Sequence, residues 1–135
     1  SVVDGTKKLR ALLVDDVPMN LKVLSVMLKK LDVDSVSLAS AEDVLEHLKN
    51  DVPDILFTDM WMPGMNGAEL AQKLRSESRF SSLPIVAVTA DAESRENFSM
   101  QDFSGILLKP ITLEKLANLF ASLKIQLTKK KKTTQ

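Results

Sequence analysis

Short apolar runs alternate with stretches of helical periodicity along the chain. The apolar runs fall at residues 9–14, 35–38, 55–57, 85–88 and 106–108, and leucine or alanine recurs in most of the intervening stretches at the spacing of a helix face. Such alternation predicts parallel strands that are joined by helical crossovers, with helices on both faces of the sheet. We therefore expect a doubly wound α/β fold with five strands and five helices.

The second expected strand has a different polarity pattern from the others. Ser35 and Ser37 alternate there with Val36 and Leu38, whereas the first strand is nearly continuously apolar and the third and fourth are apolar throughout. Alternation suits a strand at the edge of a sheet, and continuous apolar runs suit interior strands. We predict the flavodoxin-like strand order 2-1-3-4-5, in which the topology reverses between strands 1 and 3. Ligands bind at the carboxyl ends of the strands at such a reversal.

Acidic side chains follow both of those strands. Asp15 and Asp16 come after the first strand, and Asp59 comes after the third. A single aspartate at a strand end is often a loop or cap residue, but here both positions coincide with the predicted ligand crevice. Two carboxylates about 4 Å apart repel by roughly 4 kcal/mol at an effective dielectric constant near 20, so we expect a bound cation. With all-oxygen ligands, Mg²⁺ is the expected metal, and Mn²⁺ or Ca²⁺ could replace it.

Two further polar residues end the fourth and fifth strands. Lys109 follows the last strand and precedes Pro110, and its ammonium can reach the same crevice in the predicted strand order. Thr89 ends the fourth strand with a hydroxyl that could bond a phosphoryl oxygen or, equally, cap a helix. A carboxylate nucleophile, a metal and these two donors together predict a phosphoryl-transfer site.

The composition indicates an ordinary soluble domain and excludes several classes of function. The 135 residues suit one domain, the 18 basic and 18 acidic side chains balance, and no apolar run is long enough to span a membrane. Without a basic cluster we expect no direct nucleic-acid contact, and without cysteine there is no disulfide framework or thiolate metal site. Because residues 1–5 lack an apolar signal core, we expect a cytoplasmic location.

We divide the chain into an N-terminal extension over residues 1–7, one domain over residues 8–127, and a basic tail over residues 128–135. The tail contains four consecutive lysines. A charge run of this kind is expected to be a disordered end or the start of a linker.

Four sequence blocks resemble the signature of response-regulator receiver domains. They are Leu-Leu-Val-Asp-Asp at 12–16, Asp-Met-Trp-Met-Pro-Gly-Met-Asn-Gly at 59–67, Val-Thr-Ala at 88–90 and Leu-Lys-Pro at 108–110. The resemblance extends over about residues 8 to 127. It implies that Asp59 accepts a phosphoryl group from a phosphohistidine. It also implies that Asp16, Asp59 and the Trp61 carbonyl bind Mg²⁺ directly and that Asp15 acts through water.

The same resemblance assigns the switching residues. Thr89 would be the switch hydroxyl, and Lys109 would pair with the phosphate, with a cis peptide between Lys109 and Pro110. Many receivers carry an aromatic residue where this chain has Ile106, so the usual coupling of threonine to an aromatic side chain is not expected here, although the branched Ile106 could still repack against Thr89 as part of the switch. Asp91 adds a negative charge at the rim and is expected to tune the lifetime of the phosphorylated state. The fourth helix, expected at 92–101, has little apolar periodicity.

The segment at 14–20, which ends in Asn20, looks more like receivers of hybrid sensor histidine kinases than like those of transcription factors. The implied partners are the dimerisation and phosphotransfer helices of a histidine kinase, or a histidine phosphotransfer domain. The domain would catalyse its own phosphorylation and dephosphorylation without being a turnover enzyme, and it could belong to the cytoplasmic part of a membrane-bound kinase. His47 lacks the pattern of a phosphohistidine helix and is expected at the surface.

Several other functions are open to this architecture. The serious alternatives are a docking scaffold that works without phosphorylation and the receiver of a stand-alone response regulator. An aspartyl phosphatase is disfavoured because Met60 and Trp61 follow Asp59 in place of the Asp-x-Asp-x-Thr pattern. Flavin or nucleotide binding is disfavoured because the loop at 15–18, Asp-Asp-Val-Pro, lacks the glycine or hydroxyl cradle that phosphate needs there.

Overall fold

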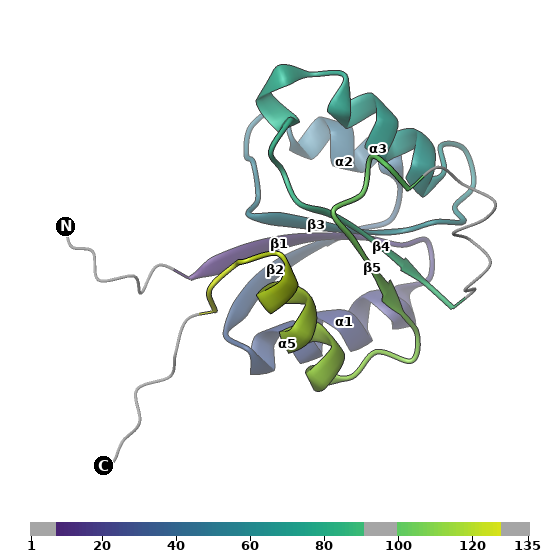
Figure 1. Ribbon diagram of the computed structural model, residues 1–135. Coiled ribbons are helices and arrows are strands. Elements are labelled where there is room, and N and C mark those ends of the chain that lie inside the picture. Colours follow the sequence, from purple (N-terminus) through teal and green to yellow (C-terminus); the bar gives the residue numbers. More distant parts are fainter. Residues whose placement is uncertain (1–7, 91–99, 128–135) are drawn as a thin grey trace, which may run out of the picture.

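A single parallel sheet forms the centre of the computed structural model, which describes residues 8–90 and 100–127 (Figure 1). The strand order is β2-β1-β3-β4-β5, so the predicted order and the edge position of the alternating strand are both confirmed. The strands are β1 Leu9–Val14, β2 Val33–Leu38, β3 Ile55–Asp59, β4 Ile85–Thr89 and β5 Gly105–Leu108.

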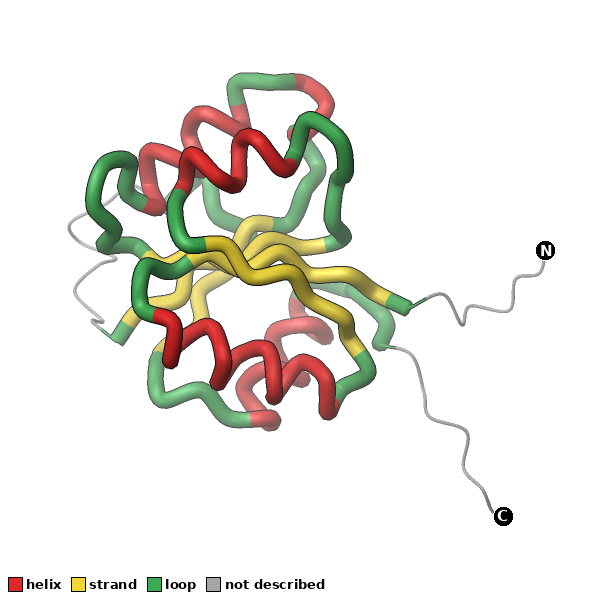
Figure 2. Tube along the Cα trace, turned by 180° about the vertical axis from the view of Figure 1, so that it is seen from behind, coloured by secondary structure: helices red, strands yellow, loops and turns green. Residues whose placement is uncertain are grey.

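Helices cover both faces of this sheet. Helices α1 and α5 lie on one face and α2 and α3 on the other, as seen edge-on in Figure 2. Their bounds are α1 Pro18–Lys30, α2 Ala41–His47, α3 Gly67–Arg75 and α5 Leu113–Ser122, and a short 3-10 helix spans Ser78–Phe80. The expected fourth helix falls mostly on residues 91–99, outside the described residues, and its expected end at 100–101 is a turn.

Helix starts follow from local hydrogen bonding. Asn66 and Glu69 form a capping box, in which the Asn66 side chain accepts from the Glu69 amide at 2.8 Å and the Glu69 carboxylate accepts from the Asn66 amide at 2.9 Å. The Ser40 hydroxyl caps α2 by accepting from the Asp43 amide at 3.1 Å. Helix α1 begins instead on Pro18, whose fixed φ suits a first helical position.

The core consists of two apolar layers, one on each face of the sheet. Successive β1 residues alternate between them: Leu13 packs with the α1 and α5 side, and Leu12 packs with the α2 and α3 side. Phe57 and Phe120 meet edge to face in the first layer, with ring centroids 6.3 Å apart. Because the central strands are buried on both faces, their carboxyl ends form a rigid platform for the residues that follow them.

The edge strand begins two residues earlier than the sequence pattern indicated. Val33 is 1% exposed and packs under α1, and the turn before it places Asp32 at a φ of 64°. Asp34 follows Val33 in this strand and pairs with Lys8 and Lys29 in exposed ion pairs. The strand therefore begins at the buried Val33, but the polar Asp34 after it made the sequence pattern place the start of the strand later.

Over the described residues, no helix is both long and apolar enough to cross a bilayer.

Candidate functional site

The register between β1 and β3 brings the acidic strand ends together. Val14 pairs with Thr58, so Asp15 and Asp59 each follow one member of that pair. The Thr58 hydroxyl donates to the Asp59 carbonyl oxygen at 2.9 Å and fixes the backbone where β3 ends. The predicted meeting of these two acids at the topological reversal is confirmed.

The register of β4 and β5 extends this row of strand ends. Asp59 pairs with Val88, and Thr89 pairs with Leu108. The Lys109 amide then donates to the Thr89 carbonyl oxygen at 2.9 Å, so Lys109 begins its loop beside Thr89. Thr89 itself is 1% exposed.

Three carboxylates and one ammonium converge in the crevice. Carboxylate oxygens of Asp15, Asp16 and Asp59 all lie within 4.8 Å of one another. The Lys109 Nζ lies 3.8 Å from Asp15 Oδ2, and the Asp15 residue is buried while Asp16 is exposed. One lysine offsets only part of three negative charges. The crevice therefore keeps an excess of negative charge that favours a cation.

The position of Asp15 is set by the start of α1. The Val17 amide donates to Asp15 Oδ1 at 2.9 Å. Val17 is the N-cap residue of α1, and its apolar side chain makes no capping hydrogen bond. The amides at a helix N-terminus carry partial positive charge, which stabilises an adjacent carboxylate. One Asp15 oxygen is thus held by the helix start, and the other faces Lys109.

Burial in the crevice raises the pKa of Asp59 to about 6 from its ordinary value of 3.8. The neighbouring Asp15 raises the pKa further, whereas Lys109 and the Met60 amide lower it. Ionisation of Asp59 therefore costs more free energy than ionisation of a solvated aspartate, and a nearby positive charge would reduce that cost. A carboxyl group of this kind is well suited to binding a cation.

The raised pKa predicts a pH-dependent cost to folding. An acid whose folded pKa lies above its unfolded pKa destabilises the fold once it ionises, and the cost vanishes when both states are protonated. With EDTA present, Asp59→Asn should therefore raise the free energy of unfolding at pH 8 by about 1–2 kcal/mol, allowing for solvent screening. Urea unfolding should show this advantage shrinking as the pH falls through 6 towards 4. An advantage that does not change with pH would contradict the assignment.

Gly67 makes a close backbone contact with the candidate site that the sequence patterns did not identify. A Cβ atom there would lie 2.3 Å from the Asp59 carbonyl oxygen and 3.0 Å from the Met60 Cα. The Gly67 amide also donates to the Met60 carbonyl oxygen at 3.1 Å. The start of α3 is thus packed directly on the backbone of Asp59 and Met60. The only signal in the sequence is the glycine that closes the block at 59–67.

The remaining candidate residues occupy varied positions around the crevice. Trp61 is 54% exposed beside the acidic cluster. Ile106 is half-buried, and strand alternation and register place it on the same face of the sheet as Thr89. The expected cis peptide between Lys109 and Pro110 is confirmed. Asp91 lies outside the described residues.

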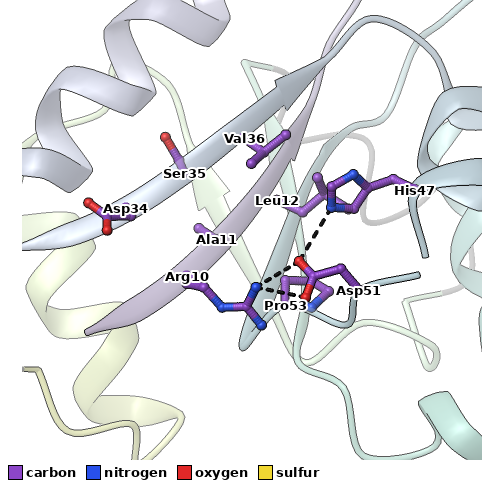
Figure 3. A pocket seen from close by; sticks show the side chains of 9 residues that line it. All are labelled: Arg10, Ala11, Leu12, Asp34, Ser35, Val36, His47, Asp51 and Pro53. Carbon is purple, nitrogen blue, oxygen red and sulfur yellow. Dashed lines mark hydrogen bonds and ion pairs between the residues drawn. The ribbon is translucent and has the colours of Figure 1, made fainter. Parts of the chain in front are cut away.

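A separate pocket lies at the opposite end of β1, where Arg10 binds Asp51 through two oxygens at 2.7 and 2.8 Å (Figure 3). His47 Nε2 lies 3.6 Å from Asp51 Oδ2, and the His47 side chain is half-buried rather than fully at the surface. The pocket has a volume of about 80 Å³, below the roughly 300 Å³ of small-molecule sites. We assign it a structural role in joining β1 to the loop before β3.

The donor set in the crevice fits a hard divalent cation. It offers carboxylate oxygens from Asp15, Asp16 and Asp59, and the only histidine in the sequence is in the pocket at the far end of β1. Mg²⁺ prefers oxygen ligands and keeps several waters, so it needs few protein carboxylates. Asp16 is exposed, so water can reach the cluster at this residue.

The chain belongs to the family of response regulator receiver domains, whose model matches residues 11–121. It is 32% identical over 115 residues to the sensor protein GacS of Pseudomonas syringae pv. syringae. That alignment covers 82% of this chain and 13% of GacS, so the chain spans about an eighth of the length of this relative.

Solved structures share the fold over nearly their whole length. A sensor protein from Polaromonas sp. JS666 is similar with a TM-score of 0.79 and 31% identity, covering 87% of this chain and 98% of that one. The receiver domain of the sensor histidine kinase PA1611 from Pseudomonas aeruginosa PAO1 has a TM-score of 0.79 at 22% identity, with coverages of 87% and 99%. The PA1611 domain was solved with a magnesium ion coordinated in its active-site cleft.

Proposed function

We propose that Asp59 accepts a phosphoryl group from the phosphohistidine of a partner protein and that its phosphorylation switches the contacts of this domain. The observation that carries the proposal is the convergence of Asp15, Asp16 and Asp59 within 4.8 Å, with Lys109 beside Asp15. A carboxylate oxygen of Asp59 forms the new bond to phosphorus as the phosphorus–nitrogen bond to imidazole breaks. The imidazole nitrogen then takes a proton from solvent. The catalysis is positioning and charge neutralisation, as phosphoryl transfer requires.

We assign metal binding to the acidic cluster of Asp15, Asp16 and Asp59. Asp16, Asp59 and the Trp61 carbonyl would hold Mg²⁺ directly, and Asp15 would act through a bound water. When bound, Mg²⁺ supplies positive charge that neutralises Asp59 and the phosphoryl oxygens. Mn²⁺ could replace it. The magnesium in the PA1611 receiver, a domain of the same fold, supports this assignment.

The switch is assigned to Thr89 and Lys109. The Lys109 ammonium can leave Asp15 to pair with a phosphoryl oxygen, and the Thr89 hydroxyl can donate to another. Ile106 shares a sheet face with Thr89 and could repack when Thr89 moves. Asp91 would tune the lifetime of the phosphorylated form from the rim of the crevice.

Exposed apolar side chains along α1, the helix that begins next to Asp15 and Asp16 in the chain, support a protein partner. Met19, Val23 and Val26 lie on one face of α1 at helical spacing, and they are 65%, 40% and 47% exposed. Val17, at the start of this helix, and Trp61 are also exposed. Exposed apolar groups beside a reactive carboxylate suit docking of the helices that carry a phosphohistidine, in a histidine kinase or a phosphotransfer domain.

We propose that the domain is the receiver of a hybrid sensor histidine kinase. We also propose that it lies in the cytoplasm, where ATP is available to phosphorylate the kinase. The support is its likeness to part of much longer sensor proteins. A receiver of a stand-alone response regulator is the alternative. In either setting the domain catalyses its own phosphorylation and hydrolysis and does not turn over a separate substrate.

Incubation with acetyl phosphate and Mg²⁺, followed by intact mass measurement, tests the acceptor assignment. We expect addition of one phosphoryl group, about 80 Da, that is absent from Asp59→Asn and from samples with EDTA, because the carboxylate and its cation are both required. Asp54→Asn, which changes an aspartate near the amino end of β3, is a matched control and should still be modified.

Lack of modification in the wild-type domain would overturn the proposal. If a phosphotransfer partner still bound the unmodified domain with undiminished affinity, a phosphorylation-independent docking scaffold would replace it.

A further inference from the structure

Lys115 holds the loop that carries Lys109. It lies in the first turn of α5, where its own amide donates to the Thr112 hydroxyl at 3.1 Å. Its Nζ donates to the Leu108 carbonyl oxygen at 3.2 Å and to the Pro110 carbonyl oxygen at 2.8 Å. These two carbonyls belong to the residues immediately before and after Lys109.

The two bonds fix the orientation of the backbone around Lys109. An ammonium group has three donors and no acceptor, so it can satisfy two carbonyl oxygens only if both point towards it. The Leu108–Lys109 peptide group and the Pro110–Ile111 peptide group, one on each side of the Lys109–Pro110 bond, therefore both turn their carbonyl oxygens towards Lys115. On the strand side, the Lys109 amide is held by the Thr89 carbonyl oxygen at 2.9 Å.

This arrangement determines where the Lys109 side chain starts. With its backbone held by Thr89 on one side and Lys115 on the other, Lys109 projects its Nζ to 3.8 Å from Asp15 Oδ2. Small displacements of a charge-bearing group can reduce a reaction rate by as much as about 100-fold for 1 Å. An exposed lysine could therefore matter to catalysis without touching the reacting atoms.

We propose that Lys115 is a positioning residue for Lys109 in the phosphoryl transfer to Asp59. The inference rests on the proposed function, and it predicts that Lys115 acts only through Lys109. The competing explanation is that Lys115 stabilises α5 and its preceding loop in a general way, with no specific effect on Lys109.

A double-mutant cycle separates these explanations. We expect Lys115→Met to slow phosphorylation by acetyl phosphate about fivefold to tenfold, and Lys115→Arg to restore most of the rate because its guanidinium can still donate to both carbonyls. In a Lys109→Met background, Lys115→Met should change the remaining rate less than about twofold. Lys73→Met, which removes an exposed lysine from α3, is the control and should leave the rate unchanged.

Amide hydrogen exchange gives a second readout that needs no phosphoryl transfer. The Lys109 amide should exchange several-fold faster in Lys115→Met than in the wild type, while amides of α3 should exchange at the wild-type rate. Unchanged exchange of the Lys109 amide would overturn the inference. So would a double variant in which Lys115→Met lowers the phosphorylation rate in the Lys109→Met background by as much as it does in the wild type. Failure of the wild-type domain to accept a phosphoryl group would overturn the proposed function instead, and exchange would still test the loop assignment.

Discussion

Gly67→Ala is expected to destabilise the domain by about 3 kcal/mol and to slow phosphorylation of Asp59 at least tenfold. The added Cβ would lie 2.3 Å from the Asp59 carbonyl oxygen. That atom belongs to the backbone, so the clash can be relieved only by moving α3 or Asp59. Helix propensity alone predicts the opposite sign, since alanine is favoured over glycine in a helix by about 1 kcal/mol.

Urea unfolding and intact mass measured over time would give the two quantities. Gly105→Ala is a matched control, because the Cβ added there would meet the Leu119 Cδ1 atom at 2.9 Å, and a leucine methyl group can shift. We expect the control to lose less stability and to keep its phosphorylation rate. A stabilised Gly67→Ala variant would show that the close approach of α3 to Asp59 is wrong.

The fold was predictable because its signals are local and periodic. Apolar continuity marked β1, β3 and β4 as interior strands, and the serines of β2 marked an edge. The acidic crevice was predictable for a related reason. Parallel strands end at the same side of a sheet, so Asp15 and Asp59 had to meet once the strand order was known.

Contacts that depend on three-dimensional distance were not predictable in this way. Nothing in the sequence pattern indicates that Gly67 touches the Asp59 backbone or that Lys115 reaches two carbonyls beside Lys109. The start of β2 was missed because a polar residue, Asp34, follows its buried first residue, Val33. In each case a contact between residues that are not neighbours in the sequence determines the local structure, and local residue preferences do not reveal such a contact.

Lys109→Met is expected to slow phosphorylation of Asp59 about 100-fold and, at the same time, to tighten Mg²⁺ binding by up to about tenfold. In the proposed function, the rate would fall because the ammonium that would pair with the phosphoryl oxygens is lost. The metal affinity rises because the same ammonium, 3.8 Å from Asp15 Oδ2, repels a cation in the acidic cluster. Methionine keeps nearly the length of the lysine side chain and removes its charge together with its hydrogen-bond donors.

The opposite signs of these two effects make the prediction specific to the charge of Lys109. Titration of Mg²⁺ against the fluorescence of Trp61, the only tryptophan, would measure the affinity. Lys109→Arg keeps a positive charge and should leave the affinity close to that of the wild type. General damage to the crevice would weaken metal binding and slow the reaction together, so a fall in both quantities would contradict the role given to Lys109. A slower reaction with tighter binding requires that the ammonium acts on the phosphoryl group and not through the fold.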